Sequence, residues 1–204
     1  MKKIITQFLT LSSFQIVLAQ QIDSTNCQFV ESAPKAFECG HYAKIIMIGY
    51  EQWPQGKNST AFFNVIKDNE KLEKLSFCGL QIDSLPSFIG NLTSLKKIEL
   101  GGGQNIEVIP KEIGNLVNLE ELILGNECQG NKISVLPAEI GNCTSLKKLD
   151  LSFNRIISLP DELKKCKYLT IITLMFNEGM TKEILAEFRI RFPKITFISE
   201  LDDK

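Results

Sequence analysis

Leucine and other apolar residues recur along the middle of this 204-residue chain at nearly fixed steps. Successive segments begin with leucine, continue in the order apolar-x-x-apolar-x-apolar, and close on an apolar residue followed by proline, and a degenerate last copy opens LTIITLMFN. The first residues of the copies are Leu72, Leu95, Leu119, Leu146 and Leu169, at steps of 23, 24, 27 and 23 residues. Such regular steps indicate a stack of repeats of one small structural unit.

Within each copy, the alternation of apolar and polar positions predicts one short β-strand. In LKKLDL, Leu149 and Leu151 follow the two-residue period of a strand, so both point inward with Leu146. Pro160 is placed to begin a short helical turn, where its missing N–H has no cost. No copy can bury its apolar face alone, so neighbouring copies must pair their strands in parallel and stack.

Residues 72–177 therefore resemble a leucine-rich repeat solenoid, and the LP-x-x-IGNL phrasing is similar to plant-type and Ras-suppressor-like repeats. The resemblance implies an α/β fold, a curved right-handed β-α superhelix of short parallel strands with a cap at each end. In that family an asparagine after each strand forms a hydrogen-bonded ladder. Asn154 and Asn177 match this position directly. Earlier copies depart from it or reach it only after insertions, so we expect the ladder to be broken at its N-terminal end.

The two ends of the chain are less regular. Residues 1–19 have two lysines, a loosely apolar run and small residues before a cleavage position, and the run is too short and polar to span a bilayer. We therefore predict a signal peptide cleaved after Ala19. Residues 20–71 would form an N-terminal cap, with a strand at AKIIMI compatible with a divergent first repeat and a helix over residues 61–68. Residues 178–204 would form the C-terminal cap, a helix followed by the strand KITFI.

The cysteines fall into different environments. Secreted members of the family often carry a disulfide in the N-terminal cap, so the resemblance implies a bond between Cys27 and Cys39. Cys143 and Cys166 occupy one buried repeat position where earlier copies have leucine, and we interpret them as small core residues with free thiols. A bridge between these two is the alternative, and the pairing of Cys78 and Cys128 stays open.

Composition and charge exclude several function classes. The net charge is −1 and no basic stripe is present, so nucleic-acid binding has no electrostatic footprint. His41 is the single histidine, and neither a close cysteine pair nor a nucleophile motif occurs. We expect no catalysis, no metal and no cofactor. The glycines at 101–103 lack the Gly-Lys-Ser or Gly-Lys-Thr ending of a phosphate-binding loop, so we interpret them as a turn.

Three glycosylation sequons begin at Asn58, Asn91 and Asn142. These asparagines can be glycosylated only in a translocated chain. The repeat phrasing creates the motif unaided at Asn91 and Asn142, so Asn58, which lies outside the repeats, is the preferred site.

The outward-facing strand positions are the candidates for recognition. Ile123, Ile171 and Met175 are expected to bring apolar groups onto the concave face towards its C-terminal end, with Phe153 and Phe176 beside them. Alternatively, the phenylalanines pack sideways between coils and the last strand is covered. The predicted partner-binding residues are Glu121, Ile123, Lys148, Asp150, Phe153, Ile171, Thr173, Met175 and Phe176.

These observations favour a non-catalytic, secreted monomer that binds a protein ligand through its concave strand face and has no membrane span. The alternative is an intracellular adaptor of the Ras-suppressor type, which requires an uncleaved N-terminus and reduced cysteines. A third interpretation, a hydrolase on a repeat scaffold, requires a concave carboxylate pair with a raised pKa.

Overall fold

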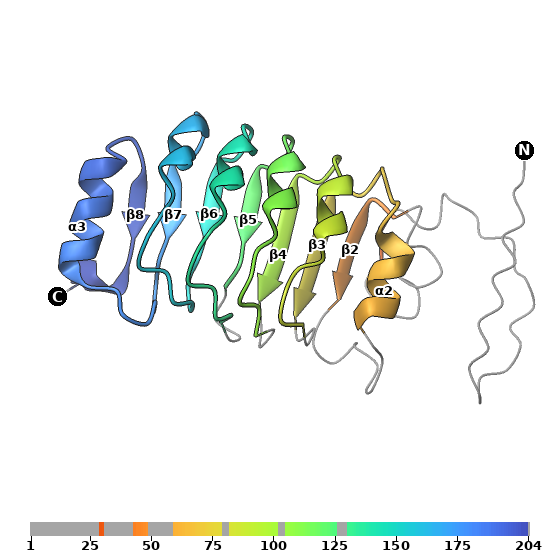
Figure 1. Ribbon diagram of the computed structural model, residues 1–204, viewed down its shortest axis with the longest axis horizontal. Helices are drawn as coiled ribbons and strands as arrows, with labels where there is room; N and C mark the ends of the chain where they lie inside the picture. The colour runs from red at the N-terminus through yellow and green to blue at the C-terminus, as the bar shows by residue number, and fades with distance from the viewer. Residues whose placement is uncertain are drawn as a thin grey trace, which may run out of the picture.

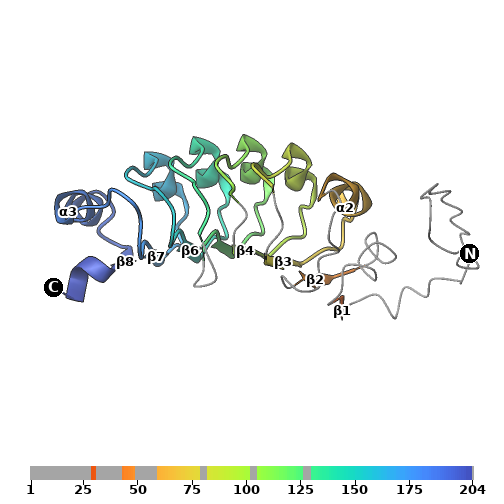
Figure 2. The ribbon, with the colours of Figure 1, turned by 90° about the horizontal axis from the view of Figure 1, so that it is seen from below.

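The computed structural model describes residues 29–30, 43–48, 59–78, 82–101, 105–125 and 130–203. A single sheet of eight parallel strands, arranged in sequence order, runs through this part of the chain (Figure 1). Helices line the other side of the sheet, and the whole forms a shallow arc with the strands on its inner side (Figure 2). The predicted leucine-rich repeat solenoid is confirmed.

The strands are β1 (Phe29–Val30), β2 (Ile45–Ile48), β3 (Lys74–Cys78), β4 (Lys97–Gly101), β5 (Glu121–Ile123), β6 (Lys148–Asp150), β7 (Ile171–Thr173) and β8 (Thr196–Ile198). The α-helices are α2 (Ser59–Ile66) and α3 (Lys182–Arg191). The 3₁₀-helices are η3 (Ser87–Asn91), η4 (Lys111–Asn115), η5 (Ala138–Asn142), η6 (Asp161–Lys165) and η7 (Glu200–Asp203). One strand and the helix that follows it make one coil of the solenoid.

Parallel pairing places equivalent repeat positions side by side. Leu122 pairs with Ile98 on one side and Leu149 on the other, and Leu149 pairs in turn with Ile172. All four side chains are fully buried. The strand period and the phase of the repeats predicted from the leucine pattern are therefore confirmed.

Each of the helices η3 to η6 begins directly after a proline, as expected for Pro160 and its equivalents. Neighbouring helices approach so closely that the glycine of the IGN phrase has no room for a side chain. A Cβ atom on Gly141 would lie 2.3 Å from the carbonyl oxygen of Glu162, and one on Gly114 would lie 2.5 Å from that of Glu139. Glycine at this position therefore sets the spacing between coils.

Buried asparagines join the coils where the chain leaves the sheet. The Asn154 side chain accepts a hydrogen bond from the Ile133 N–H (3.1 Å) and donates to the Leu124 carbonyl (3.0 Å), both in the preceding coil. Asn131 and Asn177 make equivalent contacts, with the carbonyls of Leu100 and Leu151 as the acceptors in the preceding coil. Asn105 is exposed and takes no such position, so among the described residues the ladder runs from Asn131 towards the C-terminus.

The elements at both ends agree with their sequence patterns. The strand expected at AKIIMI is β2, and the helix expected over residues 61–68 is α2. At the other end, α3 buries Leu185 and Phe188 against the core, and the ring of Phe188 lies 5.9 Å from that of Phe197 in β8.

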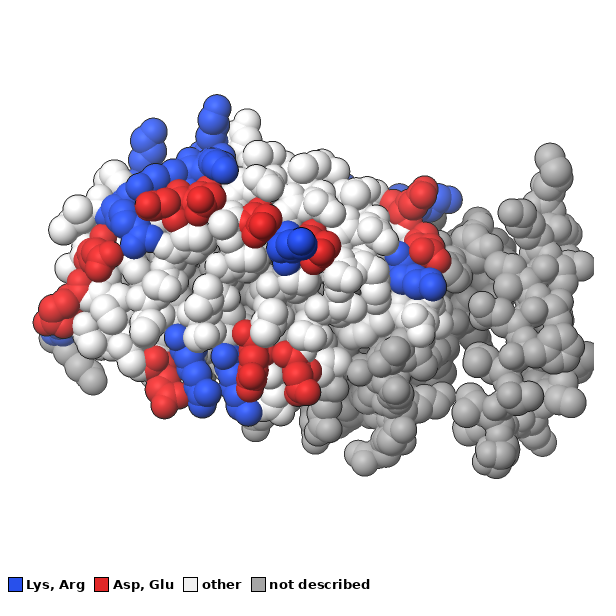
Figure 3. Space-filling model, in the orientation of Figure 1, with Lys and Arg blue, Asp and Glu red and all other residues white. Residues whose placement is uncertain are grey.

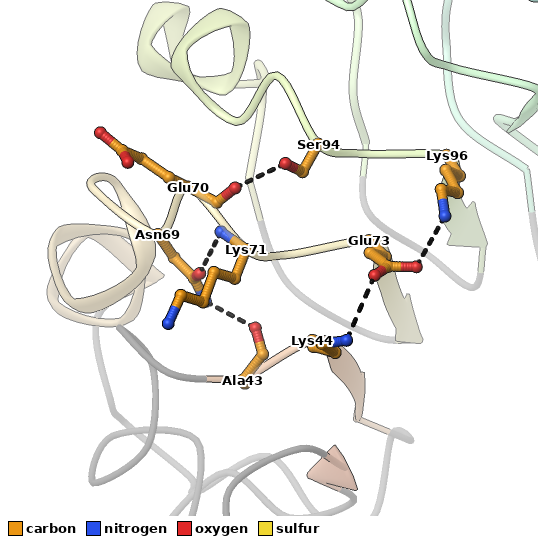
Figure 4. Close-up of polar contacts among 8 residues, drawn as sticks. All are labelled: Ala43, Lys44, Asn69, Glu70, Lys71, Glu73, Ser94 and Lys96. Atoms are coloured by element: carbon orange, nitrogen blue, oxygen red, sulfur yellow. Dashed lines mark hydrogen bonds and ion pairs between the residues drawn. The ribbon is translucent and has the colours of Figure 1, made fainter. Parts of the chain in front are cut away.

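The first coils are tied together by a polar cluster that the sequence did not reveal (Figure 4). Asn69 follows α2 and is fully buried. Its amide donates to the carbonyl of Ala43 at 2.8 Å, just before β2, and its oxygen accepts from the Lys71 N–H at 2.9 Å. This side chain links the turn after α2 to the neighbouring coil.

Cys143 and Cys166 are buried and free, as predicted. The Cys143 thiol donates to the carbonyl of Ile113 at 3.1 Å. Burial raises the pKa of Cys143 to about 12 and the pKa of Cys166 to about 11. Both thiols are therefore protonated at neutral pH and are poor nucleophiles.

We predict that Asn154→Ala lowers the free energy of unfolding by about 1–3 kcal/mol, because buried backbone groups of three segments lose their partner. Asn118→Ala is the matched control, since its amide makes an exposed hydrogen bond to the Thr93 carbonyl. We expect a change of less than about 0.5 kcal/mol there. Chemical denaturation of both variants measures the difference, and equal losses would contradict the importance of the ladder.

We also predict that Cys143 and Cys166 resist alkylation by iodoacetamide at about pH 8 in the folded protein and react after denaturation. The raised pKa values have a stability consequence. The unfolded thiols ionise above their ordinary value of 9.0 while the folded ones stay protonated, so stability should fall as the pH rises above 9.0. Peptide mapping after labelling checks the first expectation, and rapid labelling of the native chain would contradict it.

Candidate partner-binding face

The side chains that the strands turn away from the leucine core form what we call the strand face, on the inner side of the arc (Figure 2). The register aligns these outward positions into rows across β3 to β7. One row contains Lys74, Lys97, Glu121, Lys148 and Ile171, and the next contains Ser76, Glu99, Ile123, Asp150 and Thr173. The strand positions predicted to bind a partner thus lie on one continuous surface.

The charged part of the strand face pairs largely with itself. Lys97 Nζ lies 2.9 Å from a carboxylate oxygen of Glu121 in the next strand and 3.7 Å from one of Glu99 in its own strand. Asp150 accepts hydrogen bonds from the hydroxyl and the backbone N–H of Ser152, at 2.6 and 3.0 Å. These contacts hold the charged side chains in fixed positions on the face.

The pKa values of Lys97 and Glu121 are shifted in the directions expected for an ion pair. The hydrogen bond from Lys97 lowers the pKa of Glu121 below its ordinary value, although partial burial acts in the opposite direction. Partial burial would lower the pKa of Lys97, but its hydrogen bond to Glu121 and the two nearby carboxylates raise it. A carboxylic acid that donates a proton in hydrolysis needs a raised pKa. The lowered pKa of Glu121 therefore does not match the proton donor that the hydrolase interpretation requires.

A second line of charges runs beside the strand face, one position before it in each repeat. Glu73 lies between two lysines, 3.7 Å from Lys44 and 2.9 Å from Lys96 (Figure 4). Further along, Lys147 contacts Glu120 at 2.6 Å. The hydrogen bond from Lys96 is the main cause that lowers the pKa of Glu73. Opposite charges thus alternate from coil to coil along this side of the sheet.

The C-terminal part of the strand face is apolar, and one of the three apolar residues predicted to be exposed there is buried. Ile171 and Met175 are partly exposed, as predicted. Ile123 lies on the face but is only 9% exposed, so the expectation of an exposed apolar group there is wrong. It stands between Glu99 and Asp150 in its row. Ile198, which pairs with Thr173 and is 43% exposed, belongs to this surface and was not predicted.

Phe153 and Phe176 follow β6 and β7 and contact each other. Their ring centroids are 4.8 Å apart, with an interplanar angle of 35°. The sideways packing between coils therefore occurs, yet Phe176 remains 54% exposed. Both residues have left-handed backbone conformations, with φ values of 56° and 53°. A bulky side chain in that region is strained, by an amount on the order of 1–3 kcal/mol.

Hydrogen bonds to residues further along the chain hold the backbones of Phe176 and Phe153. Its N–H donates to a carboxylate oxygen of Glu200 at 2.8 Å, and the N–H of Phe153 donates to the carbonyl of Met175 at 2.7 Å. The asparagines that follow both phenylalanines are buried in the ladder. The strained conformations are therefore imposed by contacts on both sides, and they project an aromatic pair at the border of the strand face.

The structure describes some, but not all, of the residues predicted to carry glycans, a disulfide, a signal peptide or a glycine turn. Asn91 and Asn142 are exposed, at the last positions of η3 and η5. Asn58, Cys27, Cys39 and the predicted signal peptide 1–19 lie outside the described residues. Gly101 ends β4, whereas the two glycines after it lie outside as well.

The described part of the chain contains no group of three or more His, Cys, Asp or Glu residues that could hold a metal ion. Its helices are all too short or too polar to cross a membrane.

Comparison with known proteins agrees with this architecture. The family model described as Leucine Rich Repeat matches residues 145–166. None of the curated proteins matches the chain. Among solved structures, a leucine-rich repeat protein of Leptospira interrogans is similar, with 27% sequence identity and a TM-score of 0.63. The match covers 84% of this chain but 41% of that one, so the chain spans less than half the length of that protein.

In the described part of the chain, the regularly spaced parallel strands present one broad face. The leucine periodicity, the register of the sheet, the asparagine ladder and both matches agree, and this chain is a leucine-rich repeat protein.

Proposed function

We propose that this protein is a non-catalytic, secreted binding module that recognises a protein ligand through the C-terminal part of its strand face. The observation that carries the proposal is the apolar surface formed by Ile171, Met175, Ile198 and the aromatic pair Phe153–Phe176. Aromatic residues and methionine are enriched at the centres of protein interfaces, whereas charged residues are depleted there. This surface has that composition.

The neighbouring charges support the same role. Lys148 borders the apolar surface beside Ile171, and the same row continues away from it with Glu121 and Lys97, which are already paired with each other. A paired charge at the rim contributes little to affinity but discriminates against partners of the wrong charge pattern. An apolar centre with a charged rim therefore fits a specific protein ligand, and we expect the protein to act as a monomer.

The strain at the phenylalanines points in the same direction. Glycine or asparagine would occupy a left-handed position at lower cost than phenylalanine. Phenylalanine at φ values of 56° and 53° in two successive coils thus lowers stability locally. Strained conformations of this kind are concentrated at binding sites, and here the strain presents two aromatic rings to a partner.

Secretion is supported by the pattern of residues 1–19, and in a translocated chain the exposed sequon asparagines Asn91 and Asn142 would be accessible to glycosylation. The second candidate is an intracellular adaptor, which the LP-x-x-IGNL phrasing and the two free buried thiols favour. The two candidates use the same strand face but meet different sets of partners.

We predict that replacing Ile171 and Met175 together by aspartate weakens binding by about 100-fold or more, because charges would enter the apolar centre of the interface. The wild-type chain is first screened against a panel of secreted and cell-surface ectodomains, and any hit is titrated with both chains. Ile157→Asp with Ile190→Asp is the matched control, since these exposed isoleucines lie away from the strand face.

Both variants should keep the wild-type thermal midpoint, since each changed side chain is at least partly exposed. A hit that loses affinity with the control but keeps it with the Ile171/Met175 variant would move the interface elsewhere on the molecule.

The compartment is tested by expressing the full chain in a secreting eukaryotic cell and measuring its intact mass after alkylation without reduction. We expect a secreted product beginning at Gln20, carrying glycan and lacking alkyl groups at Cys27 and Cys39. A cytosolic, uncut product with alkylated cysteines and no glycan would instead support the adaptor.

A further inference from the structure

A half-open pocket lies on the helix-bearing side of the last coils, away from the strand face. Its volume of about 520 Å³ falls within the range of about 300–1,000 Å³ that is usual for ligand sites. The end of η6 and the turn after it form one wall, and the end of α3 and the turn into β8 form the other. The site therefore lies between the last repeat helix and the C-terminal helix.

The walls carry an excess of positive charge. Four cations, Lys164, Lys167, Arg191 and Lys194, line the pocket, and no carboxylate does. Asp161 lies outside the lining and pairs with Lys164 at 3.0 Å and with Arg191 at 3.2 Å. Within the described part of the chain, no ion pair involves Lys167 or Lys194. Figure 3 shows lysine and arginine side chains gathered over η6 and α3, at the upper left of the helix-bearing face.

The paired cations are held in place by the buried ring of Phe192. Lys164 Nζ lies 5.6 Å from the ring centroid and the guanidinium carbon of Arg191 lies 5.0 Å from it, both within cation–π range. Arg191 also contacts Glu187 and donates to the carbonyl of Leu159. These contacts fix Arg191 as part of the wall, so Lys167 and Lys194 are the cations available to a ligand.

The floor of the pocket is apolar. Leu163, Leu169 and Ile195 contribute to it, and the first two belong to the core. An apolar floor between lysines on two opposite walls matches a ligand with an apolar group flanked by negative charges. A sulfated glycan or a free phosphate would use the lysines and leave the floor empty. A flat membrane surface would meet the lysines, but its acyl chains would not reach a floor recessed between two walls.

We propose that this pocket binds an acidic peptide segment in which an apolar side chain is flanked by aspartate or glutamate residues. The apolar side chain occupies the floor, and its neighbouring carboxylates pair with Lys167 and Lys194. This site is separate from the strand face, so it gives the protein a second docking surface on the opposite side of the solenoid. It does not depend on the function proposed for the strand face.

The test uses the full chain and a fluorescein-labelled peptide with the sequence Asp-Glu-Phe-Glu-Asp-Gly, titrated by fluorescence anisotropy. Two companion peptides separate the contributions. Asn-Gln-Phe-Gln-Asn-Gly keeps the apolar side chain without the charges, and Asp-Glu-Gly-Glu-Asp-Gly keeps the charges without the apolar side chain. We expect the first peptide to bind at least about tenfold more tightly than either companion.

Lys167→Glu with Lys194→Glu should weaken binding of the first peptide by about tenfold or more, because both rim charges are reversed. Lys111→Glu with Lys132→Glu is the matched control, with the same change in net charge at exposed lysines elsewhere. We expect it to stay within about twofold of the wild type, a difference that long-range electrostatics alone can produce. Circular dichroism confirms that both variants are folded.

Several outcomes would overturn the proposal. Equal binding of the two acidic peptides would mean that the floor plays no part, and equal losses in the two variants would mean that only net charge matters. Absence of measurable binding by the wild type would also reject it. Binding to phosphatidylcholine–phosphatidylserine vesicles that requires Lys167 and Lys194, without peptide binding, would assign the patch to a membrane surface instead.

Discussion

Every coil of this protein depends on its neighbours to bury its inward apolar row. A strand as short as Lys148–Asp150 has no independent stability, and Leu149 is fully buried only because Leu122 and Ile172 lie on either side of it. Stability in such a stack is close to a sum of coil and interface terms. The spacing between coils is therefore the constraint that the remaining structure has to satisfy, and the glycine of each IGN phrase and the asparagine ladder both maintain it.

This constraint explains how the solenoid can hold unfavourable local conformations. Phe153 and Phe176 have left-handed backbones that they would not adopt in isolation. Asn154 and Asn177, directly after them, are fixed by hydrogen bonds to the preceding coil. The next coil accepts the Phe153 N–H, and Glu200 accepts that of Phe176. Neighbouring coils thus impose on each phenylalanine a geometry that projects an aromatic ring, which links the packing of the stack to its recognition surface.

The two proposed surfaces arise from different parts of the same repeat. The strand face is built from outward strand positions, where the register brings Lys97 and Glu121 together and ends in an apolar region. The helix-bearing pocket lies at the C-terminal end, where α3 follows the last repeat helix and Phe192 gathers cations from two elements. A regular stack repeats its surfaces, so specific sites appear where the repeat is interrupted or where its exposed residues change character.

The sequence by itself determined the repeat, its phase, the inward leucines, the ladder positions Asn154 and Asn177 and the buried free thiols, because these follow from local period, from equivalence between copies and from the resemblance to the family. It also placed Lys148, Ile171 and Thr173 on one face. Only the tertiary structure decided how exposed those residues are: Ile123 is covered and Ile198 is open, since exposure depends on side chains from adjacent coils. The same holds for the hydrogen bond of Asn69 to Ala43 and for Lys167 and Lys194, which line one pocket from separate elements.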